Sequence, residues 1–314
     1  MREMNSKRDE DKTDSRKTVT PDIFSHSLVL FYRLWHGRFR LPGAGYLLRN
    51  SSRYLPGLQN YPLPIKDVGT VIVDFRDYSG LLWLQHLLGD RMAAFDVEDG
   101  LCKALKRLIR EDDIFWDVGA NAGIVSAFVS TTMPTVKVYA FEPNPDIFKS
   151  ISSLFLKQPR VKVYPFALSD RNADVVLTIP KGKSVGGSIE GTDYVLKTSS
   201  LKKEDVDEVH VRAFRADSLI ESNADVLPPT IVKIDAEGHE VAVIRGLTKT
   251  IAKARPVIFF EHLYLSDKDI MTLVPDGYSL HSLHNLTGEF TKAFDRAVGH
   301  NSVLLPLADR RKSG

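Results

Sequence analysis

The sequence predicts an α/β fold in which a doubly wound, mostly parallel sheet carries helices on both of its faces. Short apolar segments alternate with segments of helical periodicity from about residue 96 onward, which is typical of this fold class. Acidic residues or glycines directly follow several of these apolar segments. Open parallel sheets bind ligands at the carboxyl ends of their strands, so we expect a binding site there.

The composition is that of a globular protein with a hydrophobic core. Of the 314 residues, 43% are hydrophobic and 26% are charged, which allows one large domain or one domain and a smaller unit. No apolar run approaches the roughly 18 to 20 residues of a membrane-spanning helix, and no apolar segment follows Met1 as in a signal peptide. The single cysteine, Cys102, excludes an intrachain disulfide and a zinc site built from cysteines. We therefore expect a cytoplasmic protein.

The net charge of +2 conceals an uneven distribution of charge. Residues 23–66 contain no Asp or Glu and carry a charge of +6, so the rest of the chain carries −4. The basic residues are Arg33, Arg38, Arg40, Arg49, Arg53 and Lys66. Because aromatic residues lie among them, the segment is suited to peripheral contact with an anionic membrane surface. Capture of an acidic acceptor, or packing on the acidic body or a partner subunit, fits the same pattern.

The N-terminal part of the chain predicts a tail and an extension. Residues 1–20 are nearly all polar and predict a disordered tail. Residues 21–95 predict a helical and β extension. Its expected elements are a helix from about Pro21 that ends at Gly37, irregular structure over 41–64, a strand over 71–75 and a short helix over 79–88.

Residues 96–314 predict the domain that contains the sheet. Strands are expected over 114–118, 136–141, 161–167, 231–234, 257–260, 278–283 and 302–305. Helices are expected over 101–108, from Ala122, over 145–154 and over 244–254, where apolar residues recur at spacings of three and four. The stretch from about 170 to 229 interrupts this alternation. We expect it to be an inserted hairpin around the glycine turn at Gly186-Gly187.

The segment Asp117 to Gly123 reads DVGANAG and joins the first strand of the domain to a helix. Its glycines, Gly119 and Gly123, allow a sharp turn and the close approach of a ligand. The dinucleotide fingerprint places a second glycine where this chain has Asn121, so that a pyrophosphate can touch the backbone. That glycine is absent here, and an acid, Asp117, stands just before the turn. The motif therefore favours a ligand with an amino group and without a pyrophosphate.

Further acids are predicted at the same edge of the sheet. Glu142 ends the second strand, 25 residues after Asp117, where a carboxylate can accept hydrogen bonds from a ribose. The next acids are Asp235 and Glu237 in KIDAEGHE (233–240) and Glu261 in FEH (260–262). We expect Lys233 to neutralise one of these acids. Glu240 fits the first turn of a helix, where an acid is favourable.

Six motifs follow one another along the chain: DVGANAG (117–123), FEP (141–143), FALSD (166–170), KIDAEGHE (233–240), FEH (260–262) and HNSVLLP (300–306). In this combination the sequence resembles the FkbM family of S-adenosylmethionine-dependent methyltransferases. The resemblance covers about residues 96–306, and FRDYSG (75–80) is a weaker match before it.

The resemblance implies a class I, Rossmann-like fold with a seven-stranded sheet whose last strand is antiparallel. It also implies O-methylation of a hydroxyl on a sugar-containing or other small natural product. It places the cofactor as follows: the methionine half at Asp117, Gly119, Asn121 and Gly123, the ribose at Glu142, and the adenine beside Ala167 and Leu168 with Asp170 close by. KIDAEG (233–238) matches the place where the acceptor meets the methyl group.

Methyl transfer to a hydroxyl requires alignment of the reacting atoms and a group that takes the proton. Asp235 is the first candidate for the base, followed by Glu237 and His239. A divalent ion such as Mg²⁺, held by Asp235, Glu237 and Glu261, is an alternative that lowers the pKa of the hydroxyl. The sequence does not separate the two mechanisms, and His239 and His262 fit structural roles equally well.

Other functions fit the sequence less well. An amino-group methyltransferase of nucleic acids would carry an Asn/Asp-Pro-Pro-aromatic motif after the fourth strand, and the predicted domain has no stripe of Lys and Arg. We therefore expect no nucleic-acid partner. Asn121 disfavours a nicotinamide-dependent oxidoreductase, and the complete set of Asp117, Glu142 and Asp235 disfavours a binding module without activity. The acceptor and the oligomeric state are left open.

Overall fold

A computed structural model describes residues 23–39, 44–59, 61–65, 69–73, 75–76, 84, 96–181 and 186–307. The predicted tail over residues 1–20 lies outside these described residues. The predicted helix over 79–88 also lies outside them, except for residue 84.

The central element is a seven-stranded sheet in the order β11-β12-β10-β9-β3-β4-β5. Its strands are β3 (Ile114–Val118), β4 (Lys137–Phe141), β5 (Val161–Tyr164), β9 (Ile231–Ile234), β10 (Val257–Glu261), β11 (Tyr278–Leu283) and β12 (Asn301–Pro306). The last strand, β12, pairs antiparallel with both β10 and β11, and the remaining pairs are parallel. The predicted seven-stranded, mostly parallel sheet with an antiparallel last strand is confirmed.

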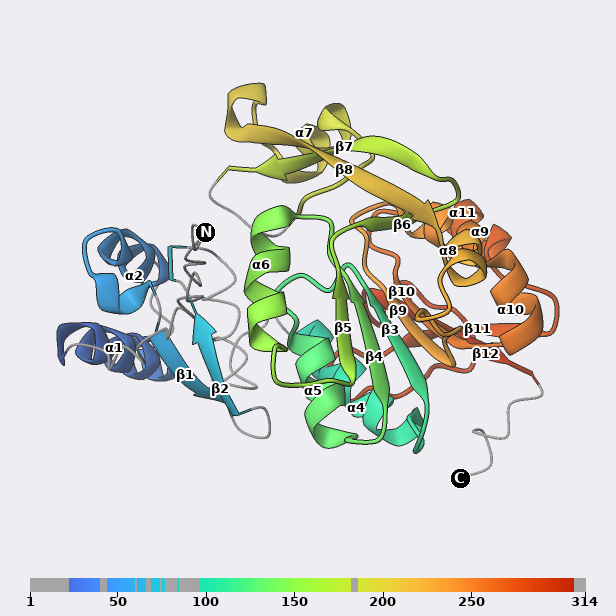
Figure 1. Cartoon of the computed structure of the whole chain (residues 1–314), viewed down its shortest axis with the longest axis horizontal. Coiled ribbons are helices and arrows are strands. Elements are labelled where there is room, and N and C mark those ends of the chain that lie inside the picture. The colour runs from blue at the N-terminus through green and yellow to red at the C-terminus, as the bar shows by residue number, and fades with distance from the viewer. Residues whose placement is uncertain are drawn as a thin grey trace, which may run out of the picture.

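Helices cover both faces of this sheet (Figure 1). Alternate residues of a strand enter different cores: Val257 and Phe259 join the apolar cluster under one layer of helices, and Ile258 and Phe260 join the cluster under the other. The first layer comprises α4 (Asp96–Leu108), α5 (Ile124–Thr132) and α6 (Pro145–Leu154). The second comprises α8 (Ala216–Ser222), α9 (Glu240–Gly246), α10 (Thr248–Ala254) and α11 (Asp267–Thr272). The sheet is therefore doubly wound.

The strand order reverses at β3, which lies between β4 and β9. In open α/β sheets such a reversal leaves a crevice at the carboxyl ends of the strands, where ligands bind. The residues that follow β3 and β9 are the DVGANAG and KIDAEGHE motifs. The topology therefore brings together two motifs that are more than a hundred residues apart in the chain.

Residues 167–169, together with strands of the predicted insertion, form a second, three-stranded sheet in the order β6-β8-β7 (Figure 1). Its strands are β6 (Ala167–Ser169), β7 (Ala173–Pro180) and β8 (Val206–Arg215), and α7 (Thr192–Ser199) and η2 (Lys203–Asp205) lie between β7 and β8. Two expectations are corrected. The predicted strand over 161–167 divides into β5 and β6, which belong to different sheets. The hairpin does not turn at Gly186-Gly187, because β7 and β8 are joined by a long segment that includes α7.

The extension is more regular than predicted. Helix α1 (Ile23–Phe39) continues through Gly37, and the region expected to be irregular contains α2 (Ala44–Ser52), η1 (Pro56–Leu58) and β1 (Tyr61–Ile65). Strand β1 pairs antiparallel with β2 (Gly69–Val73), which corresponds to the predicted strand over 71–75. The buried apolar residues of this extension are continuous with the core under α4, α5 and α6. None of the described helices is long and apolar enough to cross a membrane.

The predicted helix over 244–254 is instead divided between two helices. Helix α9 ends at Gly246 and α10 begins at Thr248, with Leu247 between them. Asp217 of α8, 3% exposed, accepts hydrogen bonds from the backbone N–H groups of Lys249 and Thr250 and from the Thr250 hydroxyl, at 2.9, 3.0 and 2.8 Å. These backbone groups belong to the first turn of α10, which has no partners of its own for them. Asp217 thus caps α10 and joins it to α8.

We expect Asp217→Ala to lower the free energy of unfolding by about 2–3 kcal/mol, since it leaves donors at the start of α10 without an acceptor. Denaturant unfolding measures the loss. The control is Glu221→Ala in the same helix, which removes only an exposed ion pair with Lys249 and should cost less than about 0.5 kcal/mol. Equal effects of the two substitutions would contradict the capping role.

Candidate functional site

A pocket of about 680 Å³, part of it open to solvent, lies at the carboxyl ends of β3, β4 and β9. One wall comes from the ends of the three strands and the segments that follow them, and the other comes from β6, β7 and residues Gly186, Gly187 and Ile189 of the insertion. The pocket therefore lies between the two sheets.

The loop after β3 turns through three residues in the left-handed region: Gly119 (φ 71°), Asn121 (φ 47°) and Gly123 (φ 78°). A Cβ on Gly119 would lie 1.8 Å from the backbone oxygen of Asp235, so no other residue fits there. A Cβ on Gly123 would lie 3.3 Å from side-chain atoms of Ile151 and of Phe155. Contacts within the protein therefore require these glycines, whereas the sequence had suggested the approach of a ligand.

Asp117 is fully buried at the end of β3 and lies beside Lys233 of β9. One carboxylate oxygen accepts a hydrogen bond from the Ser126 hydroxyl at 2.6 Å, and the other is 3.3 Å from Lys233 Nζ. Lys233 Nζ also donates to the Gly119 carbonyl at 2.9 Å and lies 3.5 Å from an oxygen of Asp235. The expectation that Lys233 neutralises an acid is confirmed. Its ammonium group lies close to two carboxylates, those of Asp117 and Asp235.

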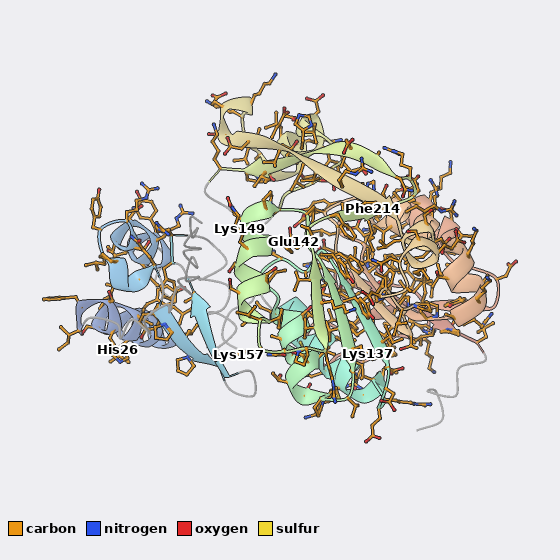
Figure 2. All side chains as sticks on the ribbon, in the orientation of Figure 1. His26, Lys137, Glu142, Lys149, Lys157 and Phe214 are labelled. Atoms are coloured by element: carbon orange, nitrogen blue, oxygen red, sulfur yellow. The ribbon has the colours of Figure 1, made fainter. Side chains whose placement is uncertain are left out.

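Glu142 lies just beyond the end of β4 and is 6% exposed (Figure 2). Its two carboxylate oxygens accept hydrogen bonds from the backbone N–H groups of Asn121 and Asn144, both at 2.8 Å. Burial raises the pKa of Glu142 to about 7, and the two backbone donors oppose this rise. Because a carboxylate has about four acceptor positions, Glu142 retains acceptor capacity toward the pocket.

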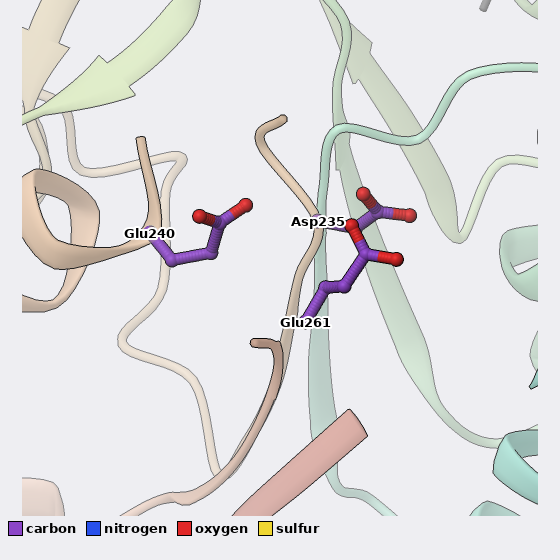
Figure 3. A group of neighbouring side chains, drawn as sticks. All are labelled: Asp235, Glu240 and Glu261. Atoms are coloured by element: carbon purple, nitrogen blue, oxygen red, sulfur yellow. The ribbon is translucent and has the colours of Figure 1, made fainter. Parts of the chain in front are cut away.

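Four acids gather where β9 and β10 end: Asp235, Glu237, Glu240 and Glu261, which we call the acidic group. Oxygens of Asp235, Glu240 and Glu261 lie within 4.8 Å of one another (Figure 3). Glu240 is 1% exposed and accepts hydrogen bonds from the backbone N–H groups of Ala236 and Gly238, at 2.8 and 3.2 Å. It therefore closes the loop before α9 as well as facing the other acids.

Burial and mutual repulsion act together on the acidic group. Burial is the larger cause in each case, and neighbouring carboxylates add to it. The pKa rises to about 7 for Glu240, to about 8 for Glu237 and to about 10 for Glu261. A bound cation would relieve this repulsion, whether it is a metal ion or a positively charged ligand.

His239 lines the pocket, but both of its ring nitrogens are occupied. Nδ1 is hydrogen-bonded to a carboxylate oxygen of Glu190, and Nε2 to the Ser169 hydroxyl at 2.9 Å. The hydrogen bond to His239 is the main reason that the pKa of Glu190 is lowered. His239 thus joins the insertion, through Glu190, to the end of β6 and to the loop after β9.

His262 is 1% exposed, and its Nδ1 is hydrogen-bonded to the Ser302 hydroxyl of β12 at 2.9 Å. Burial lowers its pKa to about 4, so the ring is neutral at physiological pH. Both His239 and His262 therefore make hydrogen bonds within the protein. These contacts fit the structural role that the sequence analysis had left open beside a catalytic one.

The structure places most of the predicted site residues on the pocket wall. These are Gly119, Asn121, Glu142, Ala167, Leu168, Asp235, Glu237 and His239. Three predicted cofactor residues, Asp117, Gly123 and Asp170, do not line it. Asp170 follows β6, where its carboxylate accepts hydrogen bonds from Ser169 and Arg171, both at 3.3 Å. Glu261 lies beyond the pocket, in the acidic group.

Several residues at the site had not been predicted. Leu177, Gly186, Gly187 and Ile189 of the insertion line the pocket, and the glycine pair was the only sequence signal for them. Glu240 joins Asp235 and Glu261 in the set that could hold a metal ion, where the sequence had suggested Glu237. Glu190 had no signal, because its role depends on a contact with a residue 49 positions away.

Comparison with known proteins identifies the family. The family model described as "Methyltransferase FkbM domain" matches residues 117–281, which is more than half of the chain. The hexuronic acid methyltransferase AglP of Haloferax volcanii is 29% identical over 181 residues, which cover 57% of this chain and 68% of AglP. The AMB antimetabolite synthetase AmbE of Pseudomonas aeruginosa is 26% identical over 179 residues, which cover 48% of this chain but only 8% of AmbE.

Among solved structures, a methyltransferase FkbM from Methylobacillus flagellatus aligns with a TM-score of 0.41 and 14% identity, over 74% of this chain and 56% of that one. The identification therefore rests on the family match and on the sheet order, not on that alignment. This chain belongs to the FkbM methyltransferase family, and it is an S-adenosylmethionine-dependent O-methyltransferase with a class I, Rossmann-like fold.

Proposed function

We propose that this enzyme methylates a hydroxyl group of a sugar-containing acceptor, and that Asp235 takes the proton of that hydroxyl. The observation that carries this proposal is the position of Asp235, which lines the cofactor pocket and also belongs to the acidic group. Its side chain is 32% exposed and is therefore accessible to an acceptor. The name of AglP, a hexuronic acid methyltransferase, supports a sugar as the acceptor class.

The pocket residues fit S-adenosylmethionine. The side-chain oxygen of Asn121 is buried and has no hydrogen-bond partner, so it is available to a donor on the ligand. Glu142 would accept hydrogen bonds from the ribose, and Ala167 and Leu168 offer apolar surface to the adenine. Asp117 and Gly123 do not line the pocket, so we assign them to the shape of the loop after β3 and not to direct contact with the cofactor. We place Asp170 at the rim on the adenine side.

The bound cofactor supplies an electrophilic methyl group on a positively charged sulfur. Asp235 would accept the proton of the acceptor hydroxyl, whose oxygen would receive the methyl group that the bound cofactor supplies. Glu237 and Glu261 can take the proton in its place only after a nearby positive charge has removed their own protons, since pKa values of about 8 and 10 keep them protonated at pH 7. His239 acts as a positioning residue, because both of its nitrogens are occupied.

Metal assistance is the alternative role for the same acids. Asp235, Glu240 and Glu261 offer three oxygen ligands, the donor type preferred by Mg²⁺ and Ca²⁺. An ion held there would lower the pKa of an acceptor hydroxyl and would make a protein base less important.

We further propose that the extension contacts an anionic membrane surface and thereby places the enzyme at the membrane periphery. Helices α1 and α2 and the turn after them expose seven large apolar side chains, and a concentration of exposed apolar side chains is typical of a contact surface. They are Ile23, Phe24, Leu30, Phe31, Tyr46, Leu47 and Tyr54, each at least 41% exposed. The segment 23–66 contains no acid, so it would be attracted to anionic lipids.

Asp235→Asn should reduce methyl transfer at least about 100-fold, because it removes the base, while S-adenosylhomocysteine binds within threefold of the wild-type affinity. Turnover and calorimetric titration measure the two effects. Asp267→Asn, at an exposed acid that pairs with Arg296, is the control. Retained turnover would remove Asp235 from the mechanism. Activity lost with EDTA and restored by Mg²⁺ would assign the acids to a metal instead.

Binding of S-adenosylmethionine at pH 7 should release more protons than binding of S-adenosylhomocysteine. Glu237, Glu240 and Glu261, with pKa values of about 7 to 10, retain protons at this pH, and a nearby positive sulfur lowers those pKa values. The product has no charge on sulfur. Calorimetry in buffers of different ionisation enthalpy counts the protons. Equal release by both ligands would place the sulfur away from the acidic group.

The enzyme should sediment with vesicles that contain anionic phosphatidylglycerol more than with vesicles of neutral phosphatidylcholine. The double variant Ile23→Ser, Phe24→Ser should bind several-fold less, because it removes two exposed apolar side chains. Leu156→Ser, at an 83% exposed position outside the extension, is the matched control. Equal sedimentation of the double variant and the control would rule out membrane contact through α1.

A further inference from the structure

We propose that Tyr194 and Tyr264, together with Asp235 and Glu261, form the subsite that binds the acceptor, and that the acceptor ring held there is an uncharged sugar. This inference rests on the proposed function and adds to it the residues that bind the acceptor and the charge of the ring.

The acidic group extends beyond the cofactor pocket, and the two tyrosines lie outside that pocket. Asp235 and Glu237 line the pocket, whereas Glu261, Tyr194 and Tyr264 do not. Asp235 also lies against Glu261 (Figure 3). An acceptor must meet the methyl group at a residue that both sides share, and Asp235 is such a residue. The tyrosines therefore lie on the acceptor side.

The two tyrosines reach this side from distant parts of the chain. Tyr194 belongs to α7 of the insertion, and Tyr264 follows Glu261 by three residues. Their rings meet edge to face, with centroids 6.1 Å apart and an angle of 79°. A Cβ on Gly238 would lie 2.2 Å from the Tyr194 hydroxyl oxygen, so this hydroxyl sits directly on the loop that carries the acids.

The pair combines the features that a sugar ring requires. A pyranose has an apolar face of C–H groups, which packs on an aromatic ring, and hydroxyls, which donate to carboxylates. Tyr264 is 41% exposed and offers such a ring. Burial raises the pKa of its hydroxyl, and the nearby carboxylates Glu237 and Glu261 add to this rise. The hydroxyl oxygen of Tyr194 is buried without a hydrogen-bond partner, so it can pair with an acceptor hydroxyl.

The charge around the subsite favours an uncharged ring. Among the described residues, Lys233 is the cation that the structure places against the acidic group, and it is already engaged by Asp117 and the Gly119 carbonyl. A carboxylate on the acceptor would meet the same burial and the same neighbouring carboxylates that raise the pKa values of Glu237 and Glu261, and the described residues offer it no further cation there. A hexuronate, the acceptor class in the name of AglP, is therefore disfavoured here.

The test measures kcat and KM for a panel of methyl hexopyranosides and the matching hexuronates. Wild-type enzyme should methylate a neutral hexopyranoside with a kcat/KM at least tenfold above that of its hexuronate. Tyr264→Ala should raise the KM for the sugar at least tenfold, with a change in kcat below threefold. Tyr194→Phe should lower kcat/KM three- to tenfold, because it removes only the hydroxyl. S-adenosylhomocysteine affinity should stay unchanged in both variants, which shows that they are folded.

Leu156→Ala, at an exposed apolar position far along the chain from the subsite, is the matched control and should behave as wild type. A hexuronate preferred over its neutral sugar would overturn the inference about charge. Sugar turnover with an unchanged KM in Tyr264→Ala would overturn the subsite but leave the proposed function intact. Bound S-adenosylhomocysteine with no turnover of any sugar would overturn the proposed function and the subsite with it.

Discussion

A buried lysine holds the centre of the sheet and the centre of the site together. Lys233 Nζ lies 3.3 Å from Asp117, 3.5 Å from Asp235 and 2.9 Å from the Gly119 carbonyl, so one cation joins the ends of β3 and β9. Asp117 is fully buried and would be costly to keep charged without this partner. The loop after β3 and the loop after β9 thus take fixed positions at the point where the strand order reverses.

The insertion completes the site that this lysine organises. Glu190 reaches His239 from the segment between β7 and α7, and His239 in turn contacts Ser169 at the end of β6. Tyr194 of α7, also in the insertion, packs closely against Gly238 in the loop after β9. Through these contacts the insertion forms one wall of the pocket and places Tyr194 against the loop that carries the acids.

Much of the fold could be predicted from the amino-acid sequence. The strands of the main sheet are short apolar segments, and their alternate residues are buried on both faces, so the alternation with helical segments was enough to predict the doubly wound sheet. Elements fixed by distant contacts were missed. Helix α10 begins where Asp217 caps it from α8, and residues 161–167 divide because β6 pairs with β8 and not with β5.

The sequence by itself determined which motifs stand at the strand ends, because a parallel sheet brings carboxyl ends to one edge whatever the loops do. Only the tertiary structure decided which side chains meet there. Left-handed backbone at Glu237 (φ 50°) and Gly238 (φ 97°) turns the chain so that Glu240 folds back toward Asp235 and Glu261. Likewise, both ring nitrogens of His239 are hydrogen-bonded only because the fold brings Glu190 and Ser169, both far away in the chain, to this ring.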